Sequence, residues 1–449
     1  MSGRKTARDI AQSALYSVFY EGAYSNLGLM ALLDKYDPPP AERALATEIT
    51  YGVIQNYRLL DAYIAAFSKM PPRKLQRRAL IILRMAFYQL LFLERIPDSA
   101  AVSEAVKMAR RSLNSGAAGY VNGVLRSFLR EENFKPKLPD DETARLSVEY
   151  SLPDWMAKHF IKSYGRDAGE RIIRASNDRP AAYIRLNEYR ADEETLRRAL
   201  SEENAAIQSA GFPAGAYIFT GKGDPARTKA FSKGMFFFED ITSQLAAAAL
   251  DAREGCTVID VCASPGAKSF AAAQYMKGKG TVYAFDLHEN RVGLIKTAAE
   301  RLGISIVKPA AGDASVPNEA LYECADAVMA DVPCSGLGTL SKKPDIRLKD
   351  EKELQTLPET QNKILNTASK YVKPGGTLVY STCTLNPAEN EDAVAAFLKA
   401  NPDFSAQEPY TGNAPEDIII RRNKTVTFLP DKCFGDGFFI AKLKKERRM

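Results

Sequence analysis

Residues 260–269 read DVCASPGAKS, and this stretch decides how we expect the second half of the chain to fold. The apolar run before it is typical of a strand, and Ser264, Pro265 and Gly266 predict a turn into a helix that begins near Gly266. Such a helix start leaves backbone N–H groups unpaired and directed at one place, beside Lys268. The stretch therefore predicts a site for a carboxylate or a phosphate.

The next strand supports this interpretation. Residues 281–286 (TVYAFD) end at Asp286, about the separation at which α/β folds place an acid for ribose hydroxyls. The turn matches neither the GxGxxG nor the Walker A loop. Because small residues also close turns without any ligand, the turn alone does not identify what binds there.

Strands and helices continue to alternate toward the C-terminus. Helices are predicted at residues 289–302 and 353–371, and strands near residues 306–307, before Asp331 and before Cys383. This alternation predicts a parallel, doubly wound sheet, in which the carboxyl ends of the strands form the ligand-binding edge. The residues expected to converge there are Cys262, Asp286, Asp313, Asp331, Cys334 and Cys383.

Length and hydropathy exclude several classes of protein. The 449 residues are 45% hydrophobic, enough for two or three domains with ordinary cores. The most apolar run, residues 79–93, is interrupted by Arg84 and Gln89 and is too short to cross a membrane. Residues 1–10 lack the apolar core of a signal peptide, so we expect a cytoplasmic protein with no membrane partner.

Cysteine and histidine usage limits the chemistry. Without a secretory signal, the six cysteines are expected to be thiols. The chain has no CxxC pair and only two histidines, so neither a metal site nor a Ser-His-Asp hydrolase is expected. Cys334 and Cys383 each follow a predicted strand, which indicates either nucleophilic catalysis or a buried structural pair. The other thiols are interpreted as core residues: Cys256, Cys262, Cys324 and Cys433.

The first third of the chain carries the positive charge. Residues 1–135 hold 19 Lys/Arg and 12 Asp/Glu, while the remainder is nearly neutral. Apolar residues recur there at helical spacing, which predicts an all-helical module. Basic clusters lie within residues 4–8, 73–78 and 107–111. Each alone is compatible with a solvated surface, but three in one module favour a polyanionic partner.

Three domains are expected. Residues 134–141 (FKPKLPDD) lack an apolar pattern and mark the first boundary. We predict an all-α RNA-binding domain at residues 1–135, a small α/β, RRM-like domain at 141–232 and an α/β Rossmann-like domain at 233–449. Residues 234–250 are predicted as a strand that passes into a helix at the lip of the cleft.

Five segments together carry a resemblance to a known family: DVCASPGAKS, the acid Asp286, GDA at Asp313, DVPCSGLGTL and STCTLNPAENE. They resemble the successive motifs of S-adenosylmethionine-dependent RNA cytosine-C5 methyltransferases, over roughly residues 234–443. The Pro-Cys and Thr-Cys pair in that order is highly specific. The helical first third resembles NusB, and the combination is similar to the bacterial Sun/Fmu (RsmB) family.

The resemblance implies methylation of C5 of a specific cytosine in 16S ribosomal RNA. C5 is too weak a nucleophile unaided, and a thiolate that adds to C6 turns the ring into an enamine. By resemblance, Cys383 is the nucleophile and Cys334 assists loss of the C5 proton and product release. Asp331 resembles the acid that hydrogen-bonds the cytosine edge.

The resemblance also implies S-adenosylmethionine as the cofactor. Lys268 would pair with its carboxylate, Asp286 would bind the ribose and Asp313 the adenine amino group. The full implied cofactor-binding set is Cys262, Ala263, Ser264, Pro265, Gly266, Ala267, Lys268, Asp286, Asp313 and Asp331.

The sequence departs from the family's usual pattern at four positions. Its loop usually reads CAAPGGK, whereas Ser264 and Ala267 stand here, and Ala267 adds a methyl group where the backbone would approach the ligand. Glu239 stands where glutamine is common before Asp240, and Cys433 where histidine is frequent.

Two alternatives stay open at this point, namely a transfer-RNA methyltransferase and an RNA-binding ribosome assembly factor without turnover. Intact Lys268, Asp331, Cys334 and Cys383 favour catalysis. We expect a monomer whose partner is 16S RNA, naked or within a partly assembled small subunit. The modified cytosine does not follow from the sequence, since such RNA targets are presented by loop shape with the base turned out of its stack.

Overall fold

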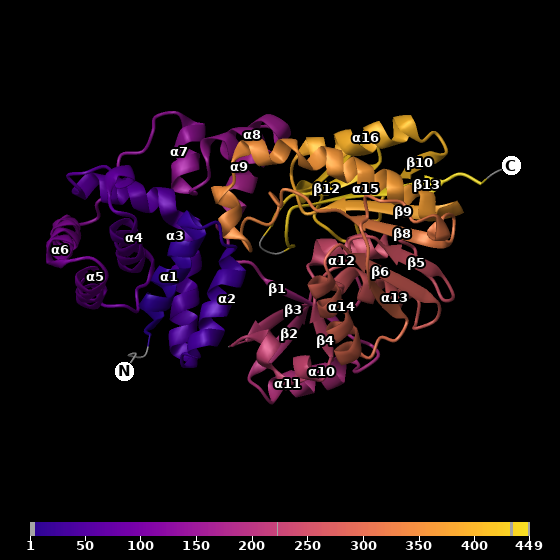
Figure 1. Ribbon diagram of the computed structural model, residues 1–449, viewed down its shortest axis with the longest axis horizontal. Coiled ribbons are helices and arrows are strands. Elements are labelled where there is room, and N and C mark those ends of the chain that lie inside the picture. The colour runs from indigo at the N-terminus through magenta and orange to yellow at the C-terminus, as the bar shows by residue number, and fades with distance from the viewer. Residues whose placement is uncertain (1–4, 222, 432–433, 448–449) are drawn as a thin grey trace. The chain divides into compact units, whose positions relative to one another are not determined.

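The computed structural model describes residues 5–221, 223–431 and 434–447. The chain forms two compact units, whose elements are labelled in Figure 1. The first unit comprises Met1–Asn177 and Leu340–Lys349, and the second comprises Asp178–Thr339 and Asp350–Met449. Among the described residues, no helix is long and apolar enough to cross a membrane.

The first unit is all-helical, as predicted. Apolar residues at helical spacing, such as Ile49 and Val53 on one helix and Leu83 and Phe87 on the next, are buried in one core. Its helices are α1 (Ala7–Tyr20), α2 (Ser25–Tyr36), α3 (Pro40–Phe67), α4 (Arg77–Phe92), α5 (Asp98–Ser112), α6 (Ser115–Leu129), α7 (Glu142–Glu149), α8 (Asp154–Tyr164) and α9 (Arg166–Ala175).

A short segment from much later in the chain completes this unit. Residues 340–349 are held by Arg347, which is 0% exposed. Its guanidinium donates to the carbonyl oxygens of Ser176 (2.6 Å) and Leu340 (3.0 Å) and to Asn177 Oδ1 (2.5 Å). Burial lowers the pKa of Arg347 to about 9. The sequence did not predict this return of the chain.

Replacing Arg347 with alanine should destabilise the first unit. The change leaves three buried acceptors unpaired and opens a cavity, and we expect a loss of about 3–5 kcal/mol in the free energy of unfolding. Urea denaturation of the full chain measures this. Arg126, which is exposed on α6, provides the matched control, and Arg126→Ala should change stability by less than about 0.5 kcal/mol. Equal stability of the two variants would contradict the anchoring role.

The second unit begins with a small antiparallel sheet in the strand order β2-β3-β1-β4, which agrees with the predicted α/β insert. Leu196, Leu200 and Ala230 from its helices pack on the sheet. The strands are β1 (Ala182–Leu186), β2 (Ala205–Ser209), β3 (Ala216–Gly221) and β4 (Phe236–Phe238), and the helices are α10 (Glu193–Ser201) and α11 (Lys229–Ser232). Strand β2 (AAIQS) was not predicted, because its small and polar residues carry little alternation.

A nine-stranded mixed sheet forms the rest of this unit. Strands β7-β6-β5-β8-β9 are parallel neighbours in that order, which confirms the predicted parallel arrangement for this part. They are β5 (Thr257–Asp260), β6 (Thr281–Asp286), β7 (Val307–Ala311), β8 (Ala325–Asp331) and β9 (Val372–Thr382). Antiparallel strands extend the sheet from β9 and were not predicted: β10 (Phe404–Gln407), β11 (Ile419–Arg422), β12 (Thr425–Phe428) and β13 (Phe438–Lys445).

Helices cover both faces of the large sheet. In the view of Figure 1, α15 and α16 lie above the strands, and α12, α13 and α14 lie below them. Ile364 and Phe397, from the upper helices, are buried in one core with Val328 and Tyr380 from the strands. The five helices are α12 (Ile241–Ala248), α13 (Ala267–Tyr275), α14 (Glu289–Leu302), α15 (Leu357–Tyr371) and α16 (Glu391–Ala400).

Buried hydrogen bonds join the small sheet to the large one. Asn187 Nδ2, just after β1, donates to the carbonyl oxygens of Gly234 (2.7 Å) and Leu302 (2.8 Å). Arg185 Nε donates to Gln274 Oε1 of α13 at 2.6 Å. The two sheets therefore share one compact unit, and the boundaries proposed from the sequence (1–135, 141–232 and 233–449) stay predictions.

Candidate active site

The carboxyl ends of five adjacent parallel strands gather the residues that the sequence singled out. Cys262 lies just beyond β5, Asp286 ends β6 and Asp313 follows β7. Asp331 ends β8 and is paired in register with Ser381 on β9, two residues before Cys383. These side chains come from segments more than 100 residues apart, and the strand order places them along one edge of the sheet.

The two cysteines in this group lie side by side. The sulfur atoms of Cys334 and Cys383 are 3.3 Å apart. Gly338 N donates to the carbonyl oxygen of Cys383 (3.0 Å), which holds the two loops together at the backbone as well. The hydrogen bond with Cys383 and burial together raise the pKa of Cys334 well above its usual value. Cys334 is therefore a protonated thiol at neutral pH while its neighbour stays in this position.

A half-buried ion pair links the predicted cofactor loop to the cysteine region. Lys268 Nζ lies 2.8 Å from Asp331 Oδ2 and 3.3 Å from Ser243 Oγ. The other oxygen of Asp331 accepts from Ser381 Oγ at 2.7 Å. Burial alone would lower the pKa of Lys268, but the hydrogen bond and attraction of Asp331, together with the attraction of Glu239 and Asp260, outweigh it and the pKa is raised. Lys268 therefore stays positively charged, and both carboxylate oxygens of Asp331 are oriented.

The turn at residues 262–268 has the conformation of a helix start. Gly266 is the N-cap of α13 with φ of 108°, and a Cβ there would lie 2.6 Å from the ring of Phe270, so only glycine fits. Gly266 N donates to the carbonyl oxygen of Ala263, and Ala263 N donates to that of Phe285, both at 2.7 Å. Ala267 is the first residue of α13, where an alanine is accommodated without strain.

Asp260 lies beneath this turn and was not predicted as part of the site. Its side chain is buried and accepts from Ser269 Oγ (2.7 Å) and from Cys262 N (3.4 Å). Burial raises its pKa to about 7, although the Ser269 bond opposes the shift. The signal in the sequence was an acid at the end of an otherwise apolar strand.

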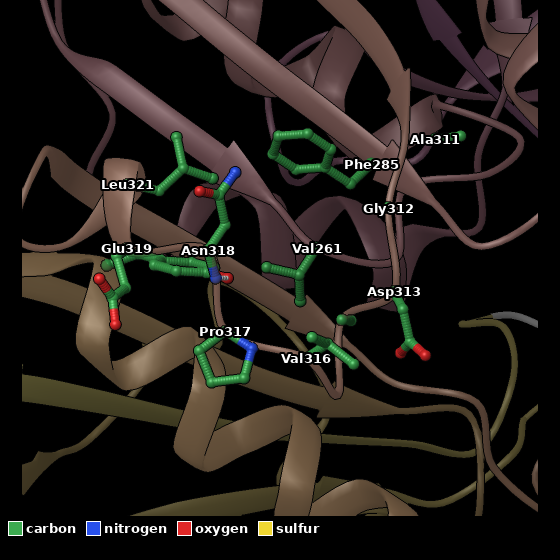
Figure 2. Close-up of a pocket in the computed structure, with 12 residues that line it drawn as sticks. Val261, Phe285, Ala311, Gly312, Asp313, Val316, Pro317, Asn318, Glu319 and Leu321 are labelled. Atoms are coloured by element: carbon green, nitrogen blue, oxygen red, sulfur yellow. Dashed lines mark hydrogen bonds between the residues drawn. The ribbon is translucent and has the colours of Figure 1, made fainter.

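A pocket of about 410 Å³ opens beside the ends of β5, β6 and β7. Val261 and Phe285 form apolar walls, and Figure 2 shows Leu321 and Asn318 on one side and Asp313 on the other. Asp313 Oδ1 accepts from Ser315 N and Oγ, and these bonds lower its pKa, so the carboxylate is ionised. The lining residues are Val261, Phe285, Ala311, Gly312, Asp313, Ala314, Val316, Pro317, Asn318, Glu319, Leu321 and Tyr371.

Asp286 does not line this pocket but lies close to its wall. It is buried, and Oδ1 accepts from His288 N at 3.2 Å while Oδ2 lies 3.6 Å from the guanidinium of Arg291. Gly312 N donates to the Asp286 carbonyl oxygen (3.0 Å) and so ties the end of β6 to the pocket.

Glu239 is a buried acid, 4% exposed. Within the described ranges 5–221, 223–431 and 434–447, neither of its carboxyl oxygens has a hydrogen-bond partner. Burial raises its pKa to about 7, against the attraction of Arg185 and Lys268 and with the repulsion of Asp240 and Asp331. The sequence had placed this segment at the lip of the cleft, and Asp240 caps α12 there by accepting from Thr242 N at 3.1 Å.

The remaining cysteines that the structure describes are not paired with one another. Cys256, Cys262 and Cys324 are free thiols of intermediate exposure. Cys433, the fourth departure from the family pattern, lies outside the described residues. Among the residues that the structure describes, no cluster of His, Cys, Asp or Glu could hold a metal ion.

The shifted pKa of Glu239 predicts a pH dependence of stability. Its folded pKa of about 7 lies above the value of 4.5 for an ordinary glutamate. Protonated Glu239 therefore contributes its full share of the folding stability below pH 4.5, and this share is lost as the pH rises from 4.5 through 7. The loss amounts to about 3 kcal/mol. Glu239→Gln should therefore gain stability relative to the wild type across this window, as measured by urea denaturation at several pH values.

The exposed Glu202 serves as the control for this measurement, and Glu202→Gln should follow the wild-type pH profile. Asp260 titrates in the same range in all three proteins, so only the difference between profiles is informative. Parallel profiles for wild type and Glu239→Gln would show that this acid is not held neutral.

Comparisons with known proteins match the whole chain. A family model of the 16S rRNA methyltransferase RsmB/F matches residues 247–444, a NusB family model matches 5–130, and the ferredoxin-like domain of RsmF/B-like methyltransferases matches 152–220. The probable ribosomal RNA small subunit methyltransferase B of Bacillus subtilis is 37% identical over 99% of both chains. The corresponding Synechocystis protein is 33% identical over 98% of this chain and 99% of its own.

Solved structures agree with these matches. The crystal structure of PH0851 superposes with a TM-score of 0.80 at 28% identity, over 97% of this chain and 98% of that one. A methyltransferase homolog from Pyrococcus horikoshii gives a TM-score of 0.58 at 25% identity, over 68% of this chain and all of its own.

The fold and the site define an S-adenosylmethionine-dependent methyltransferase that carries a NusB-like domain. Full-length identity of 37% then narrows the class: the chain belongs to the ribosomal RNA small subunit methyltransferase B family, whose members act on 16S ribosomal RNA. The resemblance seen in the sequence is confirmed, and both the NusB-like first third and the cofactor class are confirmed with it.

Proposed function

We propose that this protein methylates C5 of a specific cytosine in 16S ribosomal RNA through a covalent bond between Cys383 and C6 of the base. The observation that carries the proposal is the 3.3 Å approach of the Cys334 and Cys383 sulfur atoms, next to the oriented carboxylate of Asp331. A protein that only binds RNA has no use for two thiols at adjacent strand ends.

The residues around the pocket fit the cofactor. Its size and apolar walls suit an adenine ring, and the ionised Asp313 at its side suits the adenine amino group. Asp286, on the neighbouring strand, suits the ribose hydroxyls. Lys268 directs two of its three donors at Asp331 and Ser243, which leaves one for the methionine carboxylate. The start of α13 and the turn at residues 262–268 complete this set.

Glu239 adds a second indication that a ligand belongs here. A buried carboxyl group with neither oxygen hydrogen-bonded is costly, and such groups in native structures call for a partner. When bound, S-adenosylmethionine supplies an electrophilic methyl group.

The chain's own groups account for activation of the base. As Sγ of Cys383 bonds to C6, the thiol proton passes to N3 of the base, and the resulting enamine makes C5 nucleophilic. Asp331, held by Lys268 and Ser381, accepts a hydrogen bond from the amino group at the cytosine edge and so orients the base. After C5 is methylated, its proton is removed, the C6–S bond breaks, the C5–C6 double bond re-forms and the N3 proton returns to the Cys383 sulfur.

Cys334 is placed to remove that proton. Its hydrogen bond to Cys383 is the largest cause of its raised pKa. Once the Cys383 sulfur is bonded to carbon, this hydrogen bond no longer raises the pKa of Cys334, although burial still does. Cys334 is therefore more readily deprotonated at the stage when a base is needed at C5.

The first unit is proposed to hold the RNA. Arg73 and Lys74 are exposed, whereas Arg77 and Arg78 each lie 4.9 Å from a tyrosine ring. Part of the positive charge of the first unit is thus anchored on aromatic side chains and still faces solvent, which suits contact with phosphates. We propose that a monomer acts on 16S RNA, naked or in a partly assembled subunit.

Cysteine variants and labelled cofactor test the reaction. With unmodified ribosomal and transfer RNA in separate pools, the wild type should label ribosomal RNA. Cys383→Ala should lower methylation at least about 10³-fold and form no covalent RNA adduct. Cys334→Ala should accumulate a stalled adduct, visible as a shifted band on denaturing gels. An adduct in Cys383→Ala would reverse the two roles, and label in transfer RNA alone would refute the substrate.

Cofactor affinity tests the pocket separately. Asp313→Ala should weaken binding of S-adenosylhomocysteine about tenfold, since one charge-assisted hydrogen bond is lost. Isothermal titration calorimetry without RNA measures this directly. Lys296, exposed on α14 and absent from the pocket lining, provides the control, and Lys296→Ala should bind as the wild type does. Unchanged affinity in Asp313→Ala would move the adenine elsewhere.

A further inference from the structure

Another buried carboxyl group lies beside the loops that carry the two cysteines. Glu389 ends a short 3₁₀ helix, Pro387–Glu389, between β9 and α16, and its side chain is 0% exposed. Oε1 accepts from Ser335 Oγ (2.5 Å) and Asn386 Nδ2 (2.9 Å). Oε2 accepts from Ser335 N (2.9 Å) and Gln361 Nε2 (2.8 Å). Four donors from three residues therefore converge on one carboxylate.

The donors belong to the loops that carry the thiols. Ser335 directly follows Cys334, and Asn386 lies three residues after Cys383. Ser335 Oγ also lies 2.5 Å from Thr384 Oγ1, the residue next to Cys383. Glu389 is thus the common acceptor between two chain segments that are about 50 residues apart.

Two further bonds fix the same loops to the sheet and to α15. Gln361 Nε2 donates to Glu389 and also to the carbonyl oxygen of Pro333 at 3.0 Å, just before Cys334. Tyr380 on β9 donates its hydroxyl to the Glu389 carbonyl oxygen at 2.6 Å. Glu389 is therefore held at its backbone and holds both loops with its side chain.

The chemistry of this group makes it hard to replace. Both carboxyl oxygens of Glu389 act as acceptors here, and four donors face them. A glutamine has the same shape, but its amide nitrogen is a donor. That amide nitrogen would face the two donors that now bind one carboxyl oxygen, and both would lose their acceptor. Each buried donor left unpaired costs about 1–3 kcal/mol.

We propose that Glu389 is a positioning residue that sets the distance between the Cys334 and Cys383 sulfur atoms. It contacts neither substrate nor cofactor in this role, and it acts by tying Ser335 to the loop that follows Cys383. The importance of Glu389 for catalysis rests on the proposed function of the two thiols. The effect of Glu389 on the distance between the thiols is independent of that function.

The test is Glu389→Gln in the full chain, with two readouts. The first is the equilibrium between the dithiol and a Cys334–Cys383 disulfide in glutathione buffers, measured without RNA or cofactor. We expect the effective concentration of one thiol at the other to fall at least about tenfold. The second is kinetics, where kcat should fall about 100-fold while KM for RNA changes less than about twofold.

Glu391→Gln is the matched control. Glu391 lies two residues further along and accepts from Thr427 Oγ1 at 3.2 Å, which is not one of the four donors that converge on Glu389. It should retain the wild-type thiol equilibrium and kcat. If Glu389→Gln does not fold, Gln361→Met removes the link to Pro333 and Glu389 and should shift the thiol equilibrium about threefold.

An unchanged thiol equilibrium in the folded variant would overturn the proposal, whatever happens to kcat. A shifted equilibrium together with an adduct that persists in Cys383→Ala would leave the positioning role intact and refute the proposed function instead. The two ideas therefore fail separately.

Discussion

The site depends on the ion pair between Lys268 and Asp331. Lys268 comes from the first turn of α13 and Asp331 from the end of β8, so the pair connects the turn after β5 to the strand that leads into Cys334. The side chains of Lys268 and Asp331 are only 13% and 27% exposed, so either charge would lose stabilisation without its partner. The position of the cofactor turn and the orientation of Asp331 therefore depend on each other.

Burial reduces the negative charge of the acids that surround this ion pair, because it raises their pKa. Glu239, Asp260 and Asp331 all act electrostatically on Lys268. If all three were ionised, the region around one lysine would carry excess negative charge. Burial raises the pKa of Glu239 and Asp260 to about 7, so both take up protons more readily than ordinary carboxyl groups do. Their protonation reduces the excess negative charge around Lys268.

Much of the catalytic half was predictable because its signals are local. The apolar strands that lead to Asp286, Asp331 and Cys383 can be recognised in the sequence. Ligands bind at the carboxyl ends of the strands in a parallel sheet, so these residues were expected to lie together. Strands β10 to β13 were not predicted, because antiparallel strands added at the edge follow no strand-helix alternation. Glu389 was quoted within a motif but not assigned a role, since its partners lie far away in the sequence and only the fold brings them to it.

The short segment that returns to the helical unit has a consequence for how the protein is made. The packing of residues 340–349 around Arg347 is part of the first unit, yet these residues are synthesised after three quarters of the chain. The N-terminal helices therefore leave the ribosome long before their last component does. Until then the surface that receives Arg347 is uncovered, and the helical unit reaches its final form only when the segment after the Cys334 loop has been translated.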